Sequence, residues 1–138
     1  MSDRLCIASG QKDNTRISAE EALECSSNGE DGCQGGYIDT AWSYAKKSGI
    51  VSGGGYGDKN SCKPYVFPPC NHYSSTGPYE SCPEDVYQAP KCSKKCVDSF
   101  GKNFDDDKRF LKKFYNVNKD EKKIMAELLA NGPLEAAL

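Results

Sequence analysis

The segment Cys62-Lys-Pro-Tyr-Val-Phe-Pro-Pro-Cys-Asn-His72 is the most informative stretch of this 138-residue chain. Its two cysteines and three prolines form a composition that neither a helix interior nor a sheet interior accommodates. It lies within a longer span, 52–101, that is rich in glycine, proline, serine, asparagine and cysteine. Because a span of that length without regular structure is unusual in a compact domain, we expect covalent cross-links to hold it.

Eight cysteines are spread along the whole chain: Cys6, Cys25, Cys33, Cys62, Cys70, Cys82, Cys92 and Cys96. An even number of cysteines in a loop-rich chain is typical of a disulfide framework, and disulfides indicate a secretory or endolysosomal compartment. Zinc is the alternative, but His72 is the only histidine and no Cys-x-x-Cys pair is present. We therefore predict disulfides and no metal site.

Charge and hydropathy exclude two classes of partner. Eighteen basic and twenty acidic residues leave a net charge of −2, without the long basic run that would attract nucleic acid. No stretch approaches the roughly 20 apolar residues that a membrane helix needs. The opening residues Met1 to Cys6 lack the apolar core of a signal peptide, so we expect the chain to begin inside a longer protein.

Two short helices are predicted before the loop-rich span. Ser18 and Glu21 form a capping box, in which each side chain would satisfy an amide of the other residue, and a helix over 19–24 follows from it. A second helix is expected over 37–47 and is stopped by Gly49. Its apolar residues recur at helical spacing: Ile38, Ala41, Trp42 and Ala45.

Regular structure is expected again near the end of the chain. Residues 110–117 have the composition of a strand, and Asn118 is the predicted N-cap of a strong helix that ends at Asn131-Gly-Pro133. The apolar face of that helix consists of Ile124, Met125, Leu128 and Leu129. Residues 134–138 begin another apolar segment, and we expect the chain to be truncated within it.

Six segments in order resemble the cathepsin B branch of the papain-like cysteine peptidases over essentially the whole length. The Gly-Cys-x-Gly-Gly turn marks papain-like enzymes loosely, whereas Pro-Pro-Cys-x-His is more specific because it opens the occluding loop of the cathepsin B branch. The segments are Ser2–Ile7, Asp31–Gly36, Gly49–Gly54, Cys62–His72, Pro90–Cys96 and Ile124–Glu135.

The resemblance implies an incomplete two-domain papain-like α+β fold. Residues 1–107 would form most of the helical, disulfide-rich left domain, including an occluding loop over 70–82. Residues 108–138 would open the β-rich right domain.

The same resemblance implies three internal disulfides: Cys25 with Cys92, Cys62 with Cys96, and Cys70 with Cys82. In a chain-entropy model each contributes about 3–4 kcal/mol of stability. Cys6 and Cys33 are left over, because their partners in the family lie upstream of this chain.

No catalytic residue is assigned within the chain. The family carries its nucleophile in a Cys-Gly-Ser-Cys-Trp motif that does not occur here, and its histidine and asparagine would follow residue 138. A Cys33–His72 dyad is the alternative, but a bridge cysteine and an occluding-loop histidine account for both residues. We expect the chain alone to be inactive, and no cofactor is implied.

Part of a substrate cleft is implied by the family pattern. Gly35 and Gly36 match a turn whose backbone pairs with the main chain of the substrate. Tyr37 and Ile38 would line neighbouring subsites, and Ala137 would lie in the wall of the S2 pocket. The structural alternatives are a tight turn for the glycines and core packing for Tyr37 and Ile38.

The occluding loop departs from the family pattern, which has two adjacent histidines there. This chain has His72 followed by Tyr73. A protonated imidazole offers charge to the C-terminal carboxylate of a substrate, whereas a tyrosine hydroxyl offers only a neutral hydrogen bond. We therefore expect a cysteine endopeptidase with weakened dipeptidyl carboxypeptidase activity.

Two other interpretations stay open. One is a non-catalytic cathepsin B-like protein that keeps the cleft for binding. The other is a small secreted disulfide protein, complete at these termini, in which Cys6 and Cys33 pair. For the peptidase, the family implies protein or peptide substrates, a propeptide, cystatin-type inhibitors and a lysosomal or secreted location.

Overall fold

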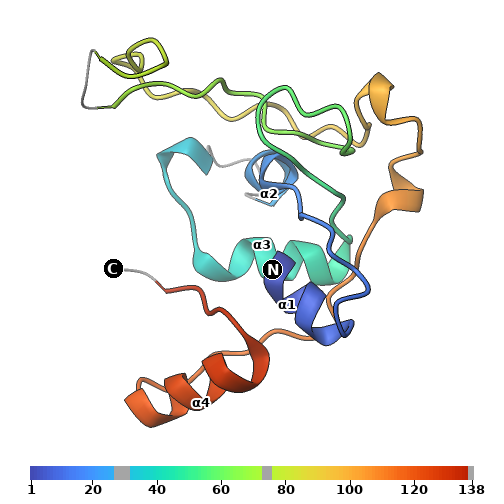
Figure 1. Ribbon diagram of the computed structural model, residues 1–138, viewed down its shortest axis with the longest axis vertical. Coiled ribbons are helices and arrows are strands. Elements are labelled where there is room, and N and C mark those ends of the chain that lie inside the picture. Colours follow the sequence, from blue (N-terminus) through green and yellow to red (C-terminus); the bar gives the residue numbers. More distant parts are fainter. Residues whose placement is uncertain (27–31, 73–75, 137–138) are drawn as a thin grey trace.

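The computed structural model of the chain describes residues 1–26, 32–72 and 76–136 (Figure 1). Its regular elements are α1 (Ser2–Ala8), α2 (Ala19–Cys25), η1 (Gly32–Gln34), α3 (Ile38–Lys47), η2 (Asp98–Phe100), η3 (Asp105–Asp107) and α4 (Glu121–Asn131), where η denotes a 3-10 helix. Within these described ranges, β structure is limited to isolated bridges. None of the helices there is long and apolar enough to cross a membrane.

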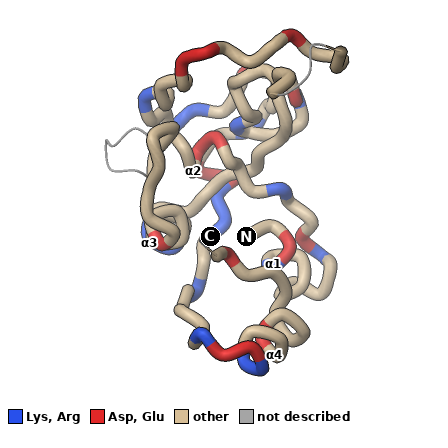
Figure 2. Tube along the Cα trace, turned by 90° about the vertical axis from the view of Figure 1, so that its left-hand side faces the viewer, with Lys and Arg blue, Asp and Glu red and all other residues tan. Residues whose placement is uncertain are grey.

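The elements form a stack (Figure 1). The loops of residues 53–72 and 76–97 lie above α2, then α3 and α1 follow, and α4 lies at the opposite end from these loops. Figure 2 shows the same order from the side, with acidic positions along α2 and charges of both signs along α4. Helix α2 therefore lies between the loops and the other helices, and α4 lies at the margin.

Helix α2 begins as predicted, but its capping box is only half formed. The Ser18 hydroxyl accepts the Glu21 amide at 3.0 Å, as an N-cap should. The reciprocal bond is absent, because the Ser18 amide donates to the Val51 carbonyl and the Glu21 carboxylate is used elsewhere. The expectation of a reciprocal box was wrong because tertiary partners displaced it.

Helix α3 ends where glycine is required. Gly49 has φ +75, and a Cβ built on it would lie 2.9 Å from the Phe110 ring. Both the backbone conformation and the aromatic neighbour therefore exclude a side chain at this position.

The segment 50–52 connects the start of α2 with the segment around Arg109 through backbone hydrogen bonds. Ile50 exchanges two backbone hydrogen bonds with Arg109, at 2.9 and 2.8 Å, and Val51 accepts from Ser18. Next to it lies a small apolar core of Val51, Cys62 and Phe104, with Cys96 and Phe100 packed against it. Because this core is small, we expect the cross-links to contribute a large part of the stability of the fold.

Three disulfides supply those cross-links, in the same pairs that the family resemblance implies. The pairs Cys25–Cys92, Cys62–Cys96 and Cys70–Cys82 have Cα–Cα distances of 4.7, 4.3 and 4.8 Å. Their sequence separations of 67, 34 and 12 residues show that two of them close long loops.

Two predictions near the end of the chain were wrong. Residues 110–117 form no strand, since pairing is limited to the single bridge between Arg109 and Ile50 and a strand needs a continuous ladder. The N-cap of α4 is Asp120 rather than Asn118: the Asp120 carboxylate accepts the Lys123 amide at 2.9 Å. Helix α4 begins at Glu121, so Asp120, directly before it, occupies the capping position and Asn118 lies outside it.

Candidate functional site

The turn at Gly35 and Gly36 lies on open surface. Gly35 has φ +122, a conformation that glycine adopts readily, and its amide donates to the Gly32 carbonyl at 3.4 Å. A Cβ built on either glycine would meet nothing within 4 Å. Both glycines therefore have open space on the side where a Cβ would lie.

Tyr37 and Ile38 follow the turn and are exposed to solvent. Their exposed fractions in this chain are 75% and 42%. The Tyr37 carbonyl accepts bonds from the Thr40 amide and hydroxyl at 3.2 and 2.7 Å. The first turn of α3 thus holds the backbone of Tyr37 while its side chain stays accessible.

The segment after α4 is held against α1 and α3. Arg4 donates to the carbonyls of Pro133 and Gly132 at 2.7 and 3.1 Å, and the Trp42 indole N–H donates to the Glu135 carboxylate. This segment leads toward Ala137, the predicted S2 residue, which lies outside the described residues.

The loop 70–82 is closed at its base. Besides the Cys70–Cys82 disulfide, the Asn71 amide donates to the Glu80 carbonyl at 2.8 Å, and the Cys82 amide donates to the Asn71 carbonyl at 3.1 Å. The Asn71 side chain also donates to the Tyr79 carbonyl. His72 is exposed on this loop, whereas Tyr73 lies outside the described residues.

A metal-like grouping at the base of this loop is explained by the disulfide. The donor atoms of Cys70, His72 and Cys82 lie within 4.8 Å of one another. A metal would need thiolate sulfurs, and both sulfurs are already consumed by their covalent bond.

Cys6 and Cys33 lie outside the three disulfides. The Cys6 thiol contacts the Asn14 side-chain oxygen at 2.9 Å, and Cys33 lies in η1. Both residues are only partly covered.

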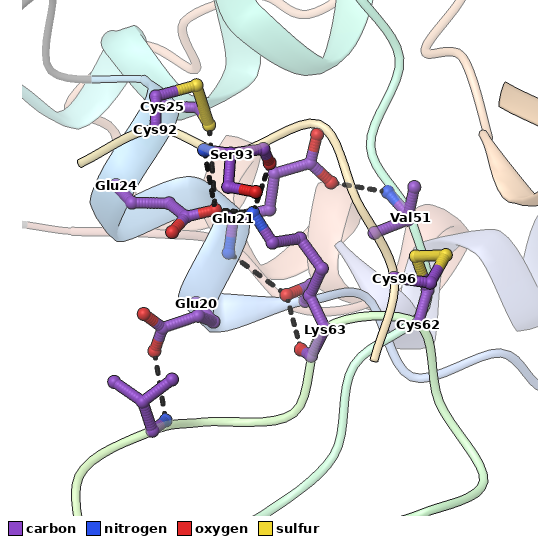
Figure 3. A network of polar contacts seen from close by, with 12 residues as sticks. Glu20, Glu21, Glu24, Cys25, Val51, Cys62, Lys63, Cys92, Ser93 and Cys96 are labelled. Atoms are coloured by element: carbon purple, nitrogen blue, oxygen red, sulfur yellow. Dashed lines mark hydrogen bonds and ion pairs between the residues drawn. A yellow bond between two sulfur atoms is a disulfide. The ribbon is translucent and has the colours of Figure 1, made fainter. Parts of the chain in front are cut away.

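The sequence did not predict the network of buried charges around α2 (Figure 3). Lys63 forms an ion pair with Glu24, with side chains 7% and 5% exposed, and also donates to the Ser93 carbonyl. The Glu21 carboxylate accepts the Tyr44 hydroxyl at 2.9 Å and the Val51 amide at 2.7 Å. These bonds tie α2 to α3, to the segment 50–52 and to the loops of residues 53–72 and 76–97.

Burial changes the acidity of several groups in this network. It raises the pKa of Tyr44, to which the hydrogen bond with Glu21 and its charge also contribute. Burial lowers the pKa of Lys63, although the charges of Glu21 and Glu20 act in the opposite direction. The one sequence signal for the site was the position of Lys63, directly after a cysteine expected to form a disulfide.

A second polar site links Ser52, at the end of the segment 50–52, to Asp107 and Arg109. The buried Asp107 carboxylate accepts the Ser52 amide and hydroxyl at 2.7 and 2.5 Å, and Arg109 pairs with it at 2.9 Å. A shallow cleft of about 330 Å³ opens beside it, and its lining includes none of residues 35–38. This cleft is therefore separate from the predicted substrate turn.

The whole chain, residues 1–138, matches the family model described as papain family cysteine protease. A cathepsin B-like cysteine proteinase 6 of Caenorhabditis elegans is 45% identical over 138 residues, and a cathepsin B-like cysteine proteinase of Schistosoma japonicum is 38% identical over 137. Each match covers 99% of this chain.

A solved structure, procathepsin B S9 from Trypanosoma congolense, superposes with a TM-score of 0.67 at 29% identity and covers 94% of this chain. The chain spans 36% of that structure, and 36% and 40% of the two curated relatives.

Proposed function

The chain belongs to the papain family of cysteine proteases, and from that premise we propose that the protein it comes from is a cathepsin B-like cysteine endopeptidase. The observation that carries the proposal is the family match over all 138 residues. In the proposed reaction, a cysteine thiolate attacks the peptide carbonyl with a histidine as proton carrier, both contributed from outside these residues. The chain alone is therefore expected to be inactive.

The proposed role of this chain is to supply part of the substrate cleft. Gly35 and Gly36 would pair with the substrate backbone, and Tyr37, Ile38 and Ala137 would line subsites. The open space beside the glycines and the exposure of Tyr37 and Ile38 support this role. We propose that residues 1–107 belong to a helical domain and 108–138 to the start of a second domain.

The loop 70–82 is proposed to act as an occluding loop with reduced exopeptidase function. The Cys70–Cys82 disulfide at its base and the exposure of His72 support a loop that presents a histidine. Because tyrosine follows that histidine, the hold on a C-terminal carboxylate would rest on a neutral hydrogen bond at position 73. The expected result is predominantly endopeptidase cleavage.

The proposed partners are those that the family resemblance implies. They are protein or peptide substrates, a propeptide and cystatin-type inhibitors, and the proposed location is lysosomal or extracellular. The three disulfides support an oxidising compartment.

The test uses the full-length protein and peptide pairs that differ only in a free or amidated C-terminus. We expect endopeptidase cleavage with little preference for the free acid, and Tyr73→His to increase release of C-terminal dipeptides from the free acid by about tenfold. Tyr73→Phe is the matched control and should not increase that release. A strong free-acid preference in the unmodified protein would contradict the weakened exopeptidase, and a full-length protein without any cysteine-dependent cleavage would contradict the peptidase.

A further inference from the structure

Glu20, in the first turn of α2, is buried with an incomplete set of partners. Its side chain is 2% exposed. Oε2 accepts the Val66 amide at 3.2 Å, whereas Oε1 is buried and accepts no hydrogen bond from any described residue. Buried polar atoms are nearly always partnered, so this oxygen requires a physical explanation.

The nearby charges do not compensate an ionised Glu20. Lys63 attracts it, but the Lys63 ammonium group pairs with Glu24 and the Ser93 carbonyl. Figure 3 draws Glu20 on its own side of α2, apart from that ammonium group. Burial raises the pKa of Glu20 above its ordinary value of 4.5, against the weaker lowering by the Val66 amide and by Lys63.

Other titratable groups around this position carry negative charge or none. Glu21 and Glu24 share the helix with Glu20, and Tyr65 faces Glu20 from the segment 63–66. Cys33 of η1 lies beside Tyr65 and raises its pKa, after burial and the charge of Glu20. Lys63 is thus the positive group that attracts the Glu20 carboxylate, and its ammonium group is already paired with Glu24.

The bond from Val66 has a particular place in the chain. The segment 63–66 is anchored by the Lys63 amide to Ser52 at 3.0 Å, by the Tyr65 amide to Gly54 at 3.1 Å, and by the Ser18 hydroxyl to the Lys63 carbonyl at 2.8 Å. Among these hydrogen bonds, the one from Val66 is nearest to Cys70. Beyond it, the Phe67 ring stacks on Tyr87 at 4.3 Å, and Pro68 and Pro69 have no amide hydrogen to donate. The contact with Glu20 therefore lies at the point where the chain enters the loop 70–82.

We propose that Glu20 is a proton-controlled clasp: protonated, it holds the segment 63–66 against α2, and its ionisation loosens that segment and the entry to the loop 70–82. The neutral acid still accepts the Val66 amide at one oxygen, and it removes the uncompensated buried charge. Ionisation releases the proton to solvent and leaves a charged oxygen without a donor, which is costly in a buried site.

The direction of the pH effect follows from linkage. Between pH 4.5 and the raised pKa of Glu20, the folded chain binds more protons than the unfolded chain. The contribution of Glu20 to the free energy of unfolding is therefore largest at the acidic end of this window and decreases as the pH rises through it. This device goes beyond peptide hydrolysis and does not depend on it.

Hydrogen exchange of the disulfide-bonded chain, corrected for intrinsic exchange rates, tests the clasp at a series of pH values. In the unmodified chain we expect the protection of amides 62–67 to fall with rising pH by up to about tenfold per unit, the limit for one proton. The Glu20→Gln variant carries a neutral isostere of the protonated acid. Its protection should stay at the acidic level across the window.

Glu24→Gln is the control on the same helix. It weakens the pair with Lys63 and should lower protection at every pH, while the pH dependence from Glu20 remains. The clasp is overturned if Glu20→Gln keeps the pH dependence of the unmodified chain. It is equally overturned if Glu20→Gln is less protected at neutral pH or fails to fold, because a neutral side chain is what the clasp requires.

Discussion

Helices α2 and α4 differ in what they bury. Helix α2 has seven residues and encloses Glu20 and Glu21, which are 2% and 0% exposed. Helix α4 has eleven residues, four of them large and apolar, yet none of its residues is buried and Leu129 is 91% exposed. In these two helices, burial therefore depends on the groups that other segments bring into contact with the helix, and the number of its own apolar residues does not decide it.

The difference has an energetic consequence. Buried charges are stable only with partners, and the carboxylates of α2 find theirs at Tyr44, Val51 and Lys63, far away in the sequence. Helix α4 is held by peripheral contacts such as the Arg4–Glu127 pair at 3.0 Å. Substitutions near α2 should therefore cost much more than substitutions on α4.

The largest expected effect is at Lys63. Replacing it with methionine leaves the Glu24 carboxylate buried without its cation, and we expect a loss of about 3–5 kcal/mol in the free energy of unfolding near neutral pH. Urea denaturation of the oxidised chain measures this loss.

Lys108→Met is a matched control for that variant. Lys108 also lies over the Phe104 ring, at 5.0 Å against 5.9 Å for Lys63, but its partner Asp105 is 84% exposed. We expect a loss below about 1 kcal/mol. Equal losses in the two variants would show that burial of the charge does not distinguish α2 from the surface.

An intermediate effect is expected at the start of α4. Asp120→Ala removes the acceptor of the Lys123 amide and should cost about 1 kcal/mol, because a helix N-cap is lost. Exchange of the amides in the first turn of α4 reports it. Asn118→Ala should change nothing measurable, since that residue contributes a backbone carbonyl to the Asp120 amide. The reverse result would restore Asn118 as the cap.

The smallest effect is expected on the exposed face of α4. Leu129→Ala should change the free energy of unfolding of this chain by no more than about 0.5 kcal/mol, because the side chain is 91% exposed. Ile50→Ala, at a residue 1% exposed, should cost about 2–5 kcal/mol. Thermal and urea unfolding compare the two, and a large loss at Leu129 would mean that α4 is packed in solution.

Much of the local structure could be predicted from local signals. Ser18 and Gly49 mark the start of α2 and the end of α3 because capping and left-handed backbone depend on the residue itself. The resemblance in the order of the cysteine segments led to the family and to the three cysteine pairs. The strand at 110–117 failed because strand formation needs a neighbour, which composition does not reveal.

The sequence by itself determined where α2 starts, where α3 stops, and the family to which the chain belongs. Only the tertiary structure decided that Glu20, Glu21 and Lys63 are buried beside the small apolar core, while in this chain the leucines of α4 are exposed. The physical reason is that a buried charge depends on partners brought from distant segments, such as Glu24 to Lys63 and Asp107 to Ser52. The burial of Glu20, with one oxygen that has no described donor, depends on the same packing of distant segments and has no local pattern in the sequence.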